Sequence, residues 1–135
     1  SLFDPPQATA GPVPRATDQP QWRDPHSGYV RRNVSPGGTV GHDGRSPIQI
    51  VEVEFPPGAM VAYEATLRER TVHEQLWVLQ GRIDFTVGLQ THRLSQGDCL
   101  ALRLDQPNRF HNPTRQPARY AVVLVAEPAA PGARR

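Results

Sequence analysis

The chain has 135 residues, a length that suits one domain, and its formal net charge is only +2. All fifteen basic residues are scattered arginines, so the composition does not favour a nucleic-acid-binding face. No apolar run approaches the ~20 residues of a membrane span, and a single cysteine excludes an intrachain disulfide.

The two ends of the chain lack the pattern of packed structure. Residues 1–20 hold five of the fifteen prolines and show no apolar periodicity, so we expect a proline-rich linker or arm there. Residues 128–135 are expected to form a flexible tail. The first residues also lack the basic and apolar regions of a signal peptide, which favours a cytoplasmic location.

Short β-like runs separated by turn residues fill the interval between the ends. No stretch carries the apolar stripe of an amphipathic helix, and this pattern predicts an all-β sandwich or barrel. Ile83, Phe85 and Val87 alternate with polar residues, as a half-buried strand requires. Cys99 has apolar neighbours and is expected to be a small buried hydrophobe. The expected strands cover residues 29–34, 48–55, 60–66, 74–79, 82–87, 91–94, 99–104 and 119–126.

Two segments carry a family resemblance. One runs from Pro57-Gly58 to Glu74 and Gly81, and the other runs from Gly97-Asp98 to Asn112. Their spacing resembles the two motifs of the cupin superfamily. The first motif is Gly, five residues, His-x-His, three or four residues, Glu, six residues, Gly, and the second ends in His, three residues, Asn. The resemblance implies a jelly-roll-like double-stranded β-helix barrel over residues 21–127, with an extended N-terminal arm.

A closer likeness is to the cupin domain that ends many bacterial XRE-type helix-turn-helix regulators. In those proteins a proline-rich linker precedes a segment like Trp22-Arg23-Asp24-Pro25 with Gly28-Tyr29. The likeness implies an unknown small-molecule effector and a homodimer, with DNA bound only through a helix-turn-helix domain absent from this chain. Trp22 is expected to anchor the arm on its own barrel or on the partner's.

The metal ligands of the cupin motifs are mostly missing. Glu64 and Thr66 stand at the His-x-His positions and Asn108 stands at the later histidine, so of the usual ligands only Glu74 remains. Strand parity turns His73 and His111 away from the face that carries Glu74 and Asn108. We therefore expect no metal cofactor and no catalytic residues, because a transition metal needs three or four convergent ligands.

These observations favour a ligand-sensing module that holds a small molecule in the barrel. Because a carboxylate inside a barrel needs a partner, Glu74 is the strongest pocket candidate. Leu76 and Phe110 also fit ordinary core packing. The alternatives are a metal-dependent cupin enzyme, such as a dioxygenase or isomerase, and a dimerisation module without a ligand. The candidate ligand-binding residues are Tyr63, Glu74, Leu76, Asn108 and Phe110.

Overall fold

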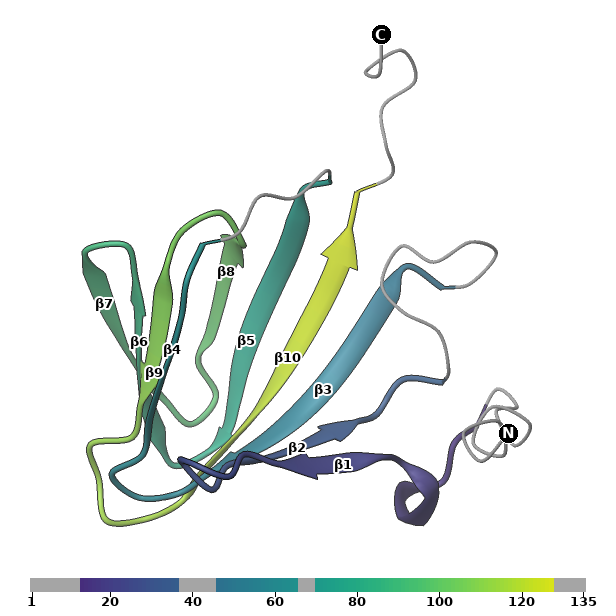
Figure 1. Ribbon diagram of the computed structural model, residues 1–135, viewed down its shortest axis with the longest axis horizontal. Coiled ribbons are helices and arrows are strands. Elements are labelled where there is room, and N and C mark those ends of the chain that lie inside the picture. Colours follow the sequence, from purple (N-terminus) through teal and green to yellow (C-terminus); the bar gives the residue numbers. More distant parts are fainter. Residues whose placement is uncertain (1–12, 37–45, 66–69, 128–135) are drawn as a thin grey trace, which may run out of the picture.

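The computed structural model describes residues 13–36, 46–65 and 70–127, and within them the chain forms two antiparallel β-sheets that face each other (Figure 1). A short 3-10 helix, η1, precedes the first strand. The elements are η1 (Ala16–Asp18), β1 (Gln21–Arg23), β2 (Val30–Asn33), β3 (Ile48–Phe55), β4 (Met60–Tyr63), β5 (Val72–Gln80), β6 (Arg82–Val87), β7 (Gln90–Ser95), β8 (Cys99–Arg103), β9 (Asn108–His111) and β10 (Ala118–Ala126).

The strands are ordered β1-β2-β3-β10-β5-β8 in the larger sheet and β4-β9-β6-β7 in the smaller sheet. From β3 to β10 the chain changes sheet at every connection except the one between β6 and β7, so neighbours in space are distant in sequence. The expected all-β, jelly-roll-like fold is confirmed. No helix among the described residues is long and apolar enough to cross a membrane.

Strand alternation places the core between the two sheets. In β5, Glu74, Leu76 and Val78 face inward and are at most 5% exposed, whereas His73 and Trp77 face outward. Apolar side chains on this inner face stabilise the fold by about 1.5–3 kcal/mol each when fully buried. The main core residues are Tyr29, Val51, Val53, Phe55, Leu76, Val78, Ile83, Phe85, Leu94, Phe110, Ala118 and Tyr120.

Two strands were not predicted from the sequence. β1 has only three residues and is defined by its pairing with β2. β9, with the sequence Asn-Arg-Phe-His, has a single apolar residue and forms because it pairs with both β4 and β6. The strand expected over residues 60–66 ends at Tyr63, and Thr66 lies outside the described residues.

The expectation that Cys99 is buried is wrong. β8 is an edge strand of the larger sheet, and Leu100 and Leu102 occupy its inward positions. Parity therefore turns Cys99 outward, where it pairs across the strands with Trp77 and is exposed. Leu100 and Leu102, the apolar neighbours on which the expectation rested, thus lie on the opposite, inward face of β8.

The first two strands, β1 and β2, form one end of the larger sheet of their own chain. The ring of Trp22 in β1 meets Tyr29 edge-on at 5.7 Å, and the guanidinium of Arg31 lies 5.4 Å from the centre of the Trp22 ring. Of the segment expected to be a linker or arm, residues 1–12 lie outside the described residues, as does the expected tail, residues 128–135.

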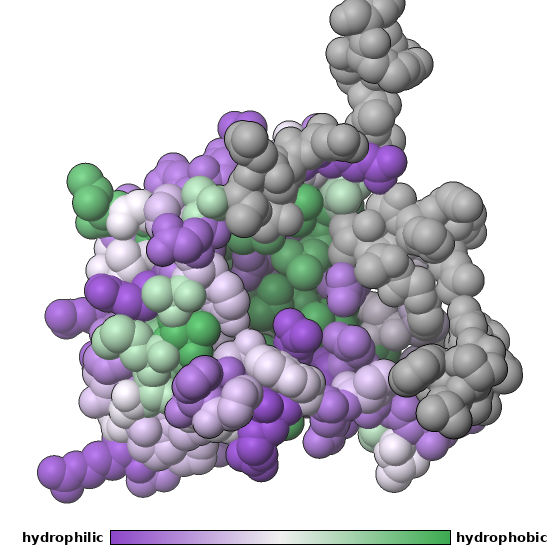
Figure 2. Space-filling model, in the orientation of Figure 1, coloured by the Kyte–Doolittle hydropathy of each residue, from purple (hydrophilic) through white to green (hydrophobic). Residues whose placement is uncertain are grey.

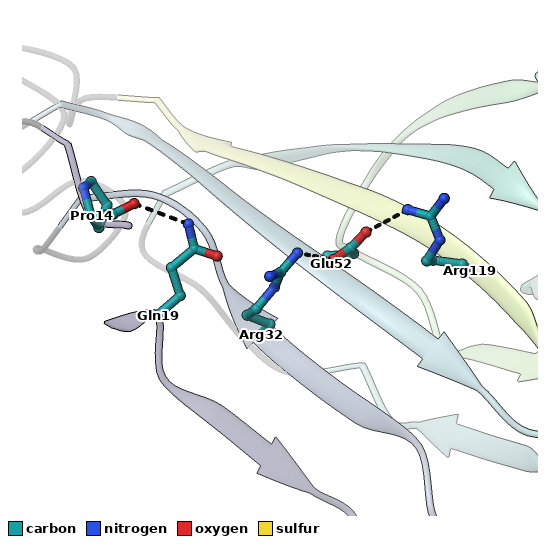
Figure 3. A network of polar contacts seen from close by, with 5 residues as sticks. All are labelled: Pro14, Gln19, Arg32, Glu52 and Arg119. Atoms are coloured by element: carbon teal, nitrogen blue, oxygen red, sulfur yellow. Dashed lines mark hydrogen bonds and ion pairs between the residues drawn. The ribbon is translucent and has the colours of Figure 1, made fainter. Parts of the chain in front are cut away.

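A polar network on the outer face ties three adjacent strands together (Figure 3). Glu52 of β3 accepts a hydrogen bond of 2.6 Å from Arg119 of β10 and forms an ion pair with Arg32 of β2. In the turn before β1, the Gln19 side chain donates a hydrogen bond to the Pro14 carbonyl at 3.2 Å. The ion pair between Arg32 and Glu52 holds β2 against β3. The inner face of β2 contributes to the cavity described next.

Candidate functional site

A cavity of about 480 Å³ lies between the two sheets. Figure 2 shows a hollow with a hydrophobic floor and hydrophilic residues around it. The volume is in the range of sites that hold small organic molecules. The lining residues are Tyr29, Arg31, Val51, Val53, Phe55, Tyr63, Glu64, Ala65, Glu74, Leu104, Gln106, Asn108, Phe110, Tyr120, Val122 and Leu124.

Aromatic side chains form much of the cavity wall. The rings of Phe110 and Tyr120 stack with their centres 5.5 Å apart, and Tyr63 meets Phe110 edge-on at 6.0 Å. Burial raises the pKa of the Tyr120 hydroxyl well above its usual value, with a smaller contribution from Tyr63, so this group stays protonated at neutral pH. The wall therefore combines flat apolar surfaces with a hydroxyl donor.

Glu74 places a carboxyl group on the inner face of β5. It is 5% exposed and lines the cavity together with Leu124, its cross-strand neighbour on β10. A buried carboxylate in such a setting favours a ligand that donates a hydrogen bond or carries positive charge, because such a ligand forms a charge-assisted hydrogen bond with it.

Tyr29 and Arg31, in the segment before β3 that contains β1 and β2, close another side of the cavity. The hydroxyls of Tyr29 and Tyr63 are 3.0 Å apart and join this segment to β4 of the smaller sheet. Burial and this hydrogen bond raise the pKa of Tyr63 well above its usual value. Arg31 follows two residues after Tyr29 on the same inward face and also lines the cavity.

The structure brings together four of the five residues predicted for the site. Tyr63, Glu74, Asn108 and Phe110 line the cavity, whereas Leu76 is fully buried in the core and does not line it. Their role in ligand binding stays a prediction.

Sequence reasoning missed several lining residues. Tyr120, Val122 and Leu124 share one face of a predicted strand, so their parity alone could have identified them. For Arg31 and Gln106, the sequence contains no comparable pattern that would have identified them as lining residues. Arg31 lies in a predicted strand without clear alternation, and the position of Gln106 depends on the loop between β8 and β9.

Residues 51–125, more than half of the chain, match the family model described as Cupin domain. The chain belongs to the cupin family. The comparison with curated proteins found no match.

Solved cupin structures with the same fold come from several kinds of protein. The cupin domain of an XRE family transcriptional regulator from Enterobacter cloacae has a TM-score of 0.61 and 15% identity over 72% of this chain and 95% of that one. An HTH_3 family regulator from Vibrio cholerae has a TM-score of 0.62 and 20% identity over 76% of this chain, which spans 55% of that regulator. KdgF from Halomonas has a TM-score of 0.63 and 18% identity over 87% of this chain and 94% of that one.

The described residues of this cupin domain do not fit a transition metal. Glu64 and Glu74 line the cavity, but Asn108 occupies the position of the later histidine. His73 instead contacts Glu127 at 2.6 Å on the outside. In the part of the chain that the structure describes, no three His, Cys, Asp or Glu residues are placed to hold a metal ion.

The asparagine that ends the second cupin motif has a structural role here. Asn112 is fully buried, and its side-chain amide donates to the carbonyls of Phe55 at 3.2 Å and Gln116 at 2.7 Å. Its oxygen accepts hydrogen bonds from the backbone and hydroxyl of Thr114. Asn112 thereby joins the end of β3 to the turn that leads into β10.

Proposed function

We propose that this cupin domain senses a small organic molecule for a bacterial transcriptional regulator and does so without a catalytic metal. The observation that carries the proposal is the cavity, whose wall includes Tyr29 and Arg31 from the segment before β3. In a regulator this segment would connect the barrel to a preceding helix-turn-helix domain. A ligand that contacts Arg31 and Tyr29 would therefore act directly on that connection.

The chemistry of the wall supports binding rather than catalysis. Its polar groups include a buried carboxyl group at Glu74, an amide at Asn108 and the hydroxyl of Tyr63. These groups can fix the orientation of a ligand, and the amide can both donate and accept hydrogen bonds. The proposed partners are an unknown small-molecule effector and a second copy of the chain, and the proposed location is the cytoplasm.

The binding part of the proposal is tested by thermal-shift measurements with a diverse set of small organic fragments. We expect some fragments to raise Tm of the wild-type chain. Glu74→Gln should leave the fold intact and weaken binding of those fragments by about 1–3 kcal/mol, since one charge-assisted hydrogen bond is lost. Glu54→Gln, which changes an exposed carboxylate on the outer face of β3, is the matched control.

The sensing part has a spectroscopic readout. The chain has two tryptophans, so in a Trp77→Phe variant, excited where tyrosine does not absorb, the emission comes from Trp22. Trp22 touches both Tyr29 and Arg31, which line the cavity. Fragments that bind should change its emission, and fragments that bind without any such change would contradict the sensing role.

The metal-dependent enzyme is tested independently by elemental analysis. We expect the mildly purified protein to hold no stoichiometric zinc, iron, manganese or nickel, since Asn108 replaces the motif histidine and the histidines of β5 and β9 lie off the site. Near-stoichiometric metal would overturn the metal-free proposal.

A further inference from the structure

Two charged residues on the cavity wall lie far apart on the larger sheet. Glu74 pairs with Leu124 of β10, whereas Arg31 pairs with Val53, which in turn pairs with Tyr120 of β10. Leu124 and Tyr120 are four residues apart, or roughly 13 Å along the strand. Glu74 and Arg31 also lie three strands apart in the order β5-β10-β3-β2. The carboxylate and the guanidinium therefore stand at opposite ends of the cavity.

The end that holds Glu74 is acidic. Leu104 donates a backbone hydrogen bond to the carbonyl of Val72, two residues before Glu74, and Gln106 follows in the same loop. Glu74, Leu104 and Gln106 all line the cavity. A buried carboxylate with an amide side chain in the adjacent loop favours a cationic group that donates hydrogen bonds.

The other end is basic and has hydroxyls. The Arg31 guanidinium lies 5.4 Å from the centre of the Trp22 ring. Within the described residues, no ion pair joins Arg31 to a carboxylate. The hydroxyls of Tyr29 and Tyr63 meet on the same side. A guanidinium with hydroxyl donors beside it matches the planar oxygens of a carboxylate.

The surface between the two ends is apolar. Val51 and Val53 of β3 and Val122 and Leu124 of β10 lie on the inner face between Arg31 and Glu74, and all four line the cavity. Polar atoms of a ligand would lose hydrogen bonds to water there without replacement. A ligand that reaches both ends must therefore be apolar in its middle.

We propose that the cavity takes an elongated zwitterion, with a protonated amine at Glu74, a carboxylate at Arg31 and an apolar chain or ring between them. This inference rests on the proposed sensing function and names the chemical class of its ligand. Because Arg31 belongs to the segment before β3, the carboxylate end of the ligand is the end that would act on the connection to a preceding domain.

The test is calorimetric titration of the full chain with probes of matched length. The zwitterions 6-aminohexanoate and 8-aminooctanoate are compared with the amine, the carboxylate and the alcohol of the same chain length. We expect the better zwitterion to bind at least about tenfold more tightly than each singly charged analogue, since each end group adds about one charge-assisted hydrogen bond.

Two variants that each remove one charge identify which end of the cavity recognises which charge. Glu74→Gln should remove the advantage of the zwitterion over the carboxylate, and Arg31→Met should remove its advantage over the amine. The controls are Glu54→Gln and Arg103→Met, which change exposed residues on the outer face and should leave all affinities unchanged.

The outcomes separate this inference from the sensing proposal. A zwitterion that binds no more tightly than the alcohol or the amine would overturn the ligand class and leave the cavity as a binding site. Equal losses in the cavity variants and in the controls would overturn the assignment of the two ends. If neither these probes nor any thermal-shift fragment binds, the sensing proposal fails as well.

Discussion

At the scale of single residues, the polar side chains of this domain divide into those that hold the fold and those that line the cavity. Asn108 and Asn112 show the difference, since they lie four residues apart around β9. The side chain of Asn112 is fully buried and makes four hydrogen bonds, whereas Asn108 is partly exposed on the cavity wall. The same residue type thus holds the barrel together at one position and lines the cavity at the other.

Asn112→Ala should lower the free energy of unfolding by about 2–4 kcal/mol, because the fully buried Asn112 side chain no longer donates to the carbonyls of Phe55 and Gln116 or accepts from Thr114. Urea denaturation measures the change. The matched control is Asn108→Ala, expected to cost less than about 1 kcal/mol. Similar losses in both variants would contradict the structural role of Asn112.

The carboxylate of Glu52 should make stability depend on pH. Burial alone would raise the pKa of Glu52, but hydrogen bonds from Arg119 and Arg32 outweigh it and hold the pKa below the ordinary value of 4.5. A carboxyl group with a lowered pKa in the folded state contributes stability above its unfolded pKa, and this contribution is lost as the pH falls through the folded pKa.

Glu52→Gln should therefore destabilise the domain by about 0.5–1.5 kcal/mol at pH 7, and the difference from wild type should shrink as the pH falls below about 4.5. Urea denaturation at a series of pH values measures this. Glu54→Gln, on the same strand, should change stability by less than about 0.5 kcal/mol at pH 7. A Glu52→Gln difference that stays constant down to low pH would contradict the account.

At the scale of elements, alternation of apolar and polar residues predicted most strands because each buries one face. β3 and β6 have the predicted bounds, and the inward parity of Glu74, Leu76 and Val78 is confirmed. β9 could not be predicted, because its strand conformation depends on partners that are distant in sequence. The exposure of Cys99 depends on which face of an edge strand is covered, and its local sequence does not contain that information.

The connection between β5 and β6 depends on a single glycine. Gly81 has φ +79°, and a Cβ at this position would lie 2.8 Å from the carbonyl oxygen of Pro117 and 3.1 Å from the Cα of Ala118. Both atoms belong to the backbone next to β10 and cannot move independently of it. The chain can change sheet here only because residue 81 lacks a side chain.

Gly81→Ala should cost about 2–4 kcal/mol of folding free energy, from the unfavourable φ and the clash together. Gly97→Ala is the matched control, since Gly97 also has a positive φ of +93° but no heavy atom within 4 Å of the added Cβ. We expect the control to cost about 1 kcal/mol. Thermal unfolding compares the two variants, and equal costs would argue against the close approach at Gly81.

At the scale of the whole molecule, the outer face of the larger sheet carries exposed apolar side chains beside its polar network of Arg32, Glu52 and Arg119. Trp77 of β5 is 50% exposed and Ile48 of β3 is 47% exposed, and Ile50 and Val123 lie between them on the same face. Exposed apolar surface of this kind is typical of a protein–protein interface. We propose that its partner is a second copy of the chain, related by a two-fold axis, since closed two-fold dimers are the commonest soluble assembly.

We expect the protein to be a homodimer at micromolar concentration by light scattering. Trp77→Glu should shift it to monomer, because a charge at the centre of an apolar interface is costly to bury. Arg93→Glu, at an exposed position of β7 in the smaller sheet, is the control and should remain dimeric. A wild-type chain that is entirely monomeric would contradict the dimer, and a dimeric Trp77→Glu variant would place its interface on another face.

The most direct test of the central proposal, that the cavity between the sheets is the ligand site of a sensing domain, is to map bound fragments onto the barrel. Two-dimensional ¹H–¹⁵N NMR spectra of the full chain would be recorded during titration with amines, carboxylates and amino acids. We predict that fragments which bind shift the amide signals of Glu74, Asn108 and Tyr120 more than those of Thr91 and Arg93 on the exposed strand β7. Shifts confined to the outer faces, or no shifts with any fragment, would contradict the proposal.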